Sequence, residues 1–303
     1  AVAFLRPVHE ARMARNRRQV ERLIRLLLDC GAPTLDFDRE VLPVSQAAHG
    51  GTITERHILF ALSRKLVGAH GQGVLLLEFV QSRMGIEVDD ALRERLLDSD
   101  NPHFLYDLLG LFKSTLVPAF FIRSDHEECP PVFDAVEFAR GIGAIPAYAY
   151  LGDVSDSATG DKKAEKFEDD YLDELVPELV RIGFQAVTYM PPRNTRAQLL
   201  RLQGLCREHG LMEVSGVDIN SSRQSFNCPI LLEPDYRHLV DAAWALIAHE
   251  KLAASDPALA LFSPENPLAD LPMLERVNKY SKLGRRIDSS QPEKAIELAG
   301  AWV

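Results

Sequence analysis

Residues 183–218 read GFQAVTYMPPRNTRAQLLRLQGLCREHGLMEVSGVD, and this stretch decides the fold. Two short apolar runs rich in β-forming residues, 186–190 and 212–217, flank a helical pattern over 195–208. Strands separated by one helix of this length pair in parallel through a crossover connection. The stretch therefore predicts a strand, helix and strand unit, with Gly183 and Gly210 placed where helices should end.

Further units of the same kind precede this stretch. Apolar runs at 117–122 and 145–150 predict two more strands, and helical patterns over 131–140 and 166–182 lie between the strands. We therefore expect an α/β fold with a parallel sheet that is either open or closed into a barrel.

The first third of the chain has a helical rhythm instead. Residues 8–28 predict an amphipathic, arginine-rich helix, a second helix should begin near Thr52 or Thr54, and others are expected over 89–97 and 102–114. We expect a mainly helical insert or cap region at 1–115 and a βα-repeat portion at 116–250. The prolines of 251–303 predict a C-terminal tail of loops and short helices packing on the outside.

Composition limits the classes of partner and compartment. The 34 basic and 44 acidic residues give a net charge of -10, which disfavours binding to nucleic acid or anionic lipid. No apolar run approaches the roughly 18 residues of a membrane span. The four cysteines form no CxxC pair, which argues against both a disulfide framework and a thiolate zinc site. These features predict a cytoplasmic protein without a nucleic-acid or membrane partner, and they leave its oligomeric state open.

Polar residues follow each predicted strand. In parallel α/β proteins the segments after the strands leave on one face, so these residues should converge on one site. Carboxylates with a histidine suit a divalent cation that activates water, and arginine or lysine suits an anionic substrate such as a phosphate ester. The pattern therefore predicts a site for phosphoester hydrolysis. Its residues should come from four strand-end segments: 123–128, 150–153 together with 159–170, 191–194, and 218–225.

Structural explanations compete for several of these residues. Lys162 fits a solvated loop, and His126 fits a surface loop bracketed by prolines. His57 either faces the site or serves as a core or capping residue. Asp218 directly follows an apolar strand, and no packing role explains it.

The stretch 183–220, with GAIPAYAY at 143–150 and GGTITERHI at 50–58, resembles PHP domains, the polymerase and histidinol phosphatase family. The resemblance spans roughly residues 12–225, and the order and spacing of its motifs are fairly specific. It implies a distorted (β/α)7-type barrel, of which this chain carries a part, with the helical region as an insert. It also implies a site for divalent metal ions (Mn, Zn, Fe or Mg) and the hydrolysis of small phosphorylated substrates.

This sequence departs from the family pattern at two ligand positions. The family's final Asp-x-His corresponds to Asp218-Ile-Asn220, and its Ala-His-Pro corresponds to Ala149-Tyr150-Leu151. Asparagine and tyrosine are poorer ligands than imidazole for zinc, iron or manganese, so the resemblance implies only Asp218 as a metal ligand. The family's N-terminal His-x-His is expected upstream of Ala1.

Two functions follow from these patterns. The first, which is the one we expect, is a metal-dependent phosphoesterase, favoured by the density of charged residues at the strand ends. The second is a catalytically inactive PHP-derived binding or regulatory protein, favoured by the tyrosine and asparagine replacements. For the phosphoesterase, the expected catalytic residues are Asp218, His126 and Tyr150, and the expected substrate-binding residues are Arg193, Arg223, Lys162 and Asn220.

Overall fold

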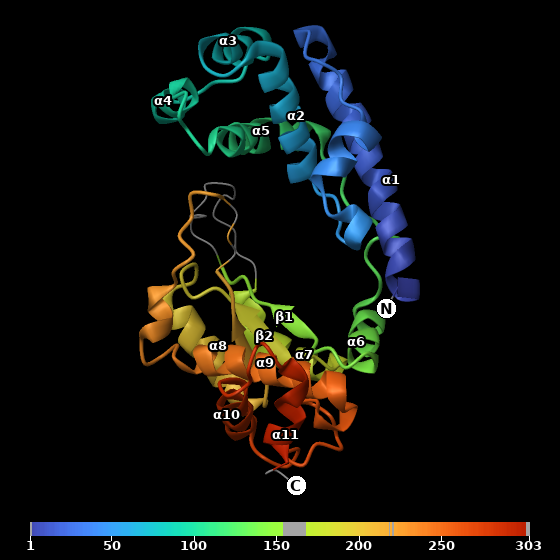
Figure 1. The fold of residues 1–303 in the computed structure, drawn as a ribbon, viewed down its shortest axis with the longest axis vertical. Coiled ribbons are helices and arrows are strands. Elements are labelled where there is room, and N and C mark those ends of the chain that lie inside the picture. Colours follow the sequence, from blue (N-terminus) through green and yellow to red (C-terminus); the bar gives the residue numbers. More distant parts are fainter. Residues whose placement is uncertain (1, 154–167, 218, 220, 301–303) are drawn as a thin grey trace. The chain divides into compact units, whose positions relative to one another are not determined.

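The computed structural model describes residues 2–153, 168–217, 219 and 221–300. It divides into two compact units, which are described separately below (Figure 1). Unit 1 contains Ala1–Pro130 and Asn220–Gln224, and unit 2 contains Pro131–Ile219 and Ser225–Val303. The described residues form an α/β protein that is mostly helical. Within those ranges, no helix has both the length and the apolar character needed to cross a membrane.

Unit 1 is helical, as the sequence predicted. Its apolar core is one cluster to which all the longer helices contribute, including Leu23 of the first helix and Phe112 of the last. The helix expected over 8–28 begins earlier than its apolar pattern indicated. The helices are α1 (Val2–Leu27), α2 (Glu55–His70), α3 (Val74–Glu78), α4 (Asp90–Leu97) and α5 (Phe104–Phe120).

The start of α2 explains His57. Thr54 is the residue before the helix, and its backbone N–H donates a hydrogen bond to Nδ1 of His57 at 3.0 Å. Such a bond satisfies one of the backbone donors that every helix N-terminus leaves free. His57 therefore has the capping role that was one of its two interpretations.

The strand expected at 117–122 is wrong, because α5 continues through it to Phe120. A short apolar run bounded by polar residues fits a buried strand and a buried helix segment equally well. Pro118 lies in the last turn of the helix, where it removes a single intrahelical hydrogen bond. The side chain of Phe120 is fully buried in the core of unit 1.

Unit 2 contains a three-stranded parallel sheet in the order β1-β2-β3. The strands are β1 (Ala147–Ala149), β2 (Ala186–Tyr189) and β3 (Met212–Ser215), so the other three strand predictions are confirmed. The helices expected before and between them are α6 (Val132–Gly141), α7 (Leu172–Ile182) and α8 (Arg196–Glu208). The sheet of the described residues is thus much smaller than a seven-stranded barrel.

Helices cover both faces of this sheet, because successive strand residues point to opposite sides. Val187 and Tyr189 pack with α7 and α8, whereas Ala186 and Met212 pack with α9 (His238–Ser255) and α10 (Met273–Gly284). The short helix α11 (Ala295–Ala299) adds to the second layer. Residues 251–300, expected as a tail, thus help to build the core of unit 2.

His249 of α9 gives unit 2 a predicted pH dependence. Its Nδ1 accepts the backbone N–H of Leu261 at 3.0 Å, and burial lowers the pKa of the imidazole below its usual value. Well above pH 6.5 the ring is neutral in the folded and the unfolded chain alike. As the pH falls through about 6.5, the unfolded chain binds the proton before the folded chain does, so the free energy of unfolding decreases. We expect a loss of up to about 1.4 kcal/mol per pH unit.

The measurement is thermal unfolding between pH 7.5 and 5.5. In His249→Asn, whose amide oxygen can still accept the Leu261 N–H, this part of the pH dependence should disappear. An equal pH dependence in both proteins would show that His249 is not responsible.

Candidate functional site

The candidate site lies at the carboxyl end of the unit 2 sheet. Because the strands are parallel, the segments that follow β1 and β2 leave from the same edge. The segment after β1 begins at Tyr150, and the turn after β2 ends at Asn194. Asp218 follows β3, but it lies outside the described residues.

Tyr150 is buried and bound to a carboxylate. It is 1% exposed, and its hydroxyl donates a hydrogen bond to Asp169. Burial and this carboxylate both raise the pKa of the phenol. At neutral pH the Tyr150 oxygen therefore carries its proton and points it at Asp169, which makes it a hydrogen-bond donor rather than an anionic ligand.

Asp169 accepts hydrogen bonds at both carboxylate oxygens. Besides Tyr150, the backbone N–H of Asp153 donates to it at 2.9 Å and the side chain of Gln198 at 2.6 Å. Burial alone would raise the pKa of Asp169, but these donors favour the charged form and lower it overall. The residue is thus an ionised anchor for the segment after β1.

Glu168 has a similar role and was missed as a candidate. It is fully buried, and its carboxylate accepts the backbone N–H groups of Leu151 at 2.5 Å and Gly152 at 2.8 Å. Its other oxygen accepts the hydroxyl of Tyr148. Glu168 therefore fixes the first turn after β1, a role that the sequence signals only weakly, through an acidic cluster just before a helix.

Gly152 allows the two strand-end segments to meet. Its φ of +67° is in the left-handed region that favours glycine. A Cβ at this position would lie 2.7 Å from both the amide nitrogen of Asn194 and the hydroxyl oxygen of Tyr150. Asn194 in turn donates to the carbonyl oxygen of Leu151 at 2.7 Å, which links the turn after β2 to the segment after β1.

Arg193 is a charged side chain in the turn after β2 with an atom left for a ligand. Its backbone N–H donates to the Met190 carbonyl at 2.9 Å, which closes the turn after β2. Within the described ranges, its buried Nε has no hydrogen-bond partner, and neither has the buried Oδ1 of Asn194. Buried polar atoms are normally hydrogen-bonded, so each unsatisfied one needs an explanation such as a bound ligand or water. A guanidinium suits a phosphate or a carboxylate.

The remaining sequence-predicted residues lie in unit 1 or outside the described residues. Arg223 lies in unit 1, where its guanidinium donates to Asp107 at 2.8 and 2.6 Å and to Asn101 at 3.0 Å. His126 also lies in unit 1, in the exposed loop that follows α5. Lys162, Asp218 and Asn220 lie outside the described residues. Of the predicted set, the structure thus places Tyr150 and Arg193 in the segments that follow the neighbouring strands β1 and β2.

The described residues do not fit a divalent metal ion. Both oxygens of Asp169 are occupied by protein donors, as are those of Glu168, and the Tyr150 phenol keeps its proton. Over the described part of the chain there is no group of three or more histidine, cysteine, aspartate or glutamate side chains suited to a metal.

Comparison with known proteins identifies no relative. No family model matches the sequence, and no curated protein and no solved structure matches it significantly.

Proposed function

We propose that this protein is a PHP-like hydrolase that acts on a small phosphorylated compound at the carboxyl end of the unit 2 sheet. The observation that carries the proposal is Arg193, a guanidinium with an unsatisfied buried Nε beside the strand ends. A dianionic phosphate would bind in the fork of this side chain through charge-assisted hydrogen bonds.

The parallel strands of unit 2, with the helices that alternate with them, support the proposal of a larger barrel fold. We propose that β1, β2 and β3 form one part of the distorted (β/α)7-type barrel implied by the PHP resemblance. Asp218, which follows β3 in the sequence after Gly216 and Val217, remains the proposed ligand of a divalent metal, with Asn220 and Lys162 proposed to contact the substrate. His126 and Arg223 were indicated by the pattern of polar residues after the expected strands rather than by the resemblance, and both lie in unit 1.

A second function is supported by a specific observation. At the position of a family histidine, the Tyr150 hydroxyl is hydrogen-bonded to Asp169 instead of being free for a metal. This contact favours a PHP-derived protein that binds a phosphorylated ligand without hydrolysing it. The two functions share the phosphate site at Arg193 and differ only in turnover.

Replacing Arg193 with glutamine is expected to lower kcat/KM for p-nitrophenyl phosphate by about 10- to 100-fold, the value of one hydrogen-bonded charge pair. The assay is release of p-nitrophenol with Mn²⁺, Zn²⁺ or Mg²⁺ added in turn. The matched control is Arg196→Gln, because Arg196 lies three residues further on and is exposed and paired with Asp235 at 2.5 Å.

Absence of turnover with every metal would overturn the hydrolase proposal and leave the binding function. Turnover that is equal in the wild type and in Arg193→Gln would show that the substrate phosphate binds elsewhere.

A further inference from the structure

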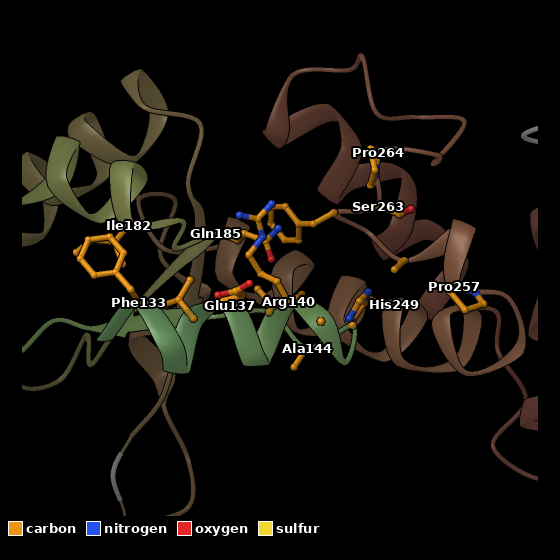
Figure 2. A pocket seen from close by; sticks show the side chains of 16 residues that line it. Phe133, Glu137, Arg140, Ala144, Ile182, Gln185, His249, Pro257, Ser263 and Pro264 are labelled. Atoms are coloured by element: carbon orange, nitrogen blue, oxygen red, sulfur yellow. The ribbon is translucent and has the colours of Figure 1, made fainter. Parts of the chain in front are cut away.

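A pocket in unit 2 lies at the opposite end of the sheet from the candidate site. Ile145, just before β1, and Gln185, just before β2, line it, together with the end of α6 and residues near the end of α9 (Figure 2). Its volume is about 760 Å³, within the 300–1,000 Å³ typical of small-molecule sites. The pocket is therefore large enough for a ligand and distinct from the Arg193 site.

Arg140 is the cation of this pocket. Figure 2 shows its side chain reaching from α6 into the middle of the pocket, between Glu137 and His249. No hydrogen bond or ion pair of its guanidinium is found among the residues that the structure describes. Gly183 makes room for it, because a Cβ there would lie 3.1 Å from Nη1 of Arg140.

The other titratable groups lining the pocket exclude a second positive charge. His249 accepts the Leu261 N–H at Nδ1, and burial lowers the pKa of its ring, so it is neutral at pH 7. Glu137, one helical turn before Arg140, contributes a negative charge. One guanidinium beside one carboxylate matches a monoanion better than a phosphate dianion, and a planar carboxylate fits the guanidinium fork in a bidentate manner.

Apolar side chains form the rest of the wall. Phe133, Ile182 and Phe262 line the pocket, and Phe133 is 47% exposed. Exposed aromatic surface beside a few polar groups is the usual composition of a small-molecule site. The pocket therefore offers an apolar surface next to the one arginine among its lining residues, Arg140, with the Arg181 guanidinium stacked over the Phe133 ring at 5.3 Å.

We infer that this pocket binds a small monocarboxylate with an apolar or aromatic body, its carboxylate on Arg140 and its body against Phe133, Ile182 and Phe262. The site lies outside the phosphate site proposed above and does not depend on it.

The test compares phenylacetate with its neutral isostere phenylacetamide by isothermal titration calorimetry and saturation-transfer NMR. The wild-type protein should bind phenylacetate at least about tenfold more tightly than phenylacetamide. Arg140→Gln should bind phenylacetate only as tightly as the wild type binds phenylacetamide. The control is Arg207→Gln, since Arg207 likewise lies in the last turn of its helix, α8. L-phenylalanine, added as a third probe, reports whether Glu137 accepts an ammonium group.

Two results would overturn the inference. One is that the wild type binds phenylacetate and phenylacetamide with equal affinity, or binds neither of them. The other is unchanged phenylacetate affinity in Arg140→Gln, whose folding is verified by an unchanged melting temperature. Tighter binding of L-phenylalanine than of phenylacetate, lost in Glu137→Gln, would support the site and narrow its ligand to an apolar amino acid.

Discussion

Replacing Glu128 with alanine is expected to destabilise unit 1 by about 3–5 kcal/mol, because it leaves a buried arginine without its partner. The Glu128 side chain is 2% exposed and that of Arg15 is 10% exposed, and the two are joined at 2.5 and 3.1 Å. Arg12 adds a further bond to the same carboxylate at 3.1 Å. Arg15 also donates to the Ile122 carbonyl at 2.8 Å, so the ion pair fixes the segment after α5 against α1.

Hydrogen exchange followed by mass spectrometry should show lost protection in α1 and in residues 121–130. The matched control is Asp38→Ala. Asp38 also holds an arginine of α1, Arg17, through two hydrogen bonds, but the two side chains are 58% and 44% exposed. Exposed pairs contribute about 0–1 kcal/mol, so the control should change little. Equal effects of the two substitutions would show that the Glu128 network does not stabilise unit 1.

Replacing Glu168 with alanine should destabilise unit 2 by more than about 3 kcal/mol, because each buried donor left unsatisfied costs about 1–3 kcal/mol. Three donors lose their acceptor: the backbone N–H groups of Leu151 and Gly152, and the hydroxyl of Tyr148. Glu168→Gln keeps a carbonyl oxygen for the two N–H groups and should cost distinctly less.

Urea unfolding followed by tryptophan fluorescence measures this effect, since Trp244, one of the two tryptophans of the chain, lies in unit 2. Glu178→Ala is the control, because Glu178 is an exposed residue of α7 paired with Arg181. If Glu168→Ala unfolds at the same urea concentration as the control, Glu168 does not anchor the segment after β1.

The sequence was sufficient for the three strands of unit 2 because each is a short β-forming run next to a clear helix. It was insufficient at 117–122, because this apolar run by itself fits a strand and a helix equally well. The helix that precedes it continues through it to Phe120. That error also placed His126 at the end of a strand, whereas the structure places it in a loop of unit 1.

The site was predictable only in part, for a similar physical reason. Arg193 lies in the turn after a strand, and this position in the sequence is enough to indicate it. Glu168 binds the segment after β1 from 16 or 17 residues away, and Arg223 is held by Asp107 at a separation of 116 residues. Such pairings depend on tertiary packing, which the local pattern of residues does not specify.

The most direct test of the proposed phosphate site is calorimetric titration of inorganic phosphate into the wild type, Arg193→Gln and Arg196→Gln. Phosphate should bind the wild type and Arg196→Gln with equal affinity, and Arg193→Gln about 10- to 100-fold more weakly, because it lacks the charged partner. Equal affinity in all three proteins, or no binding to the wild type, would contradict the assignment of the strand ends at Arg193 as a phosphate site.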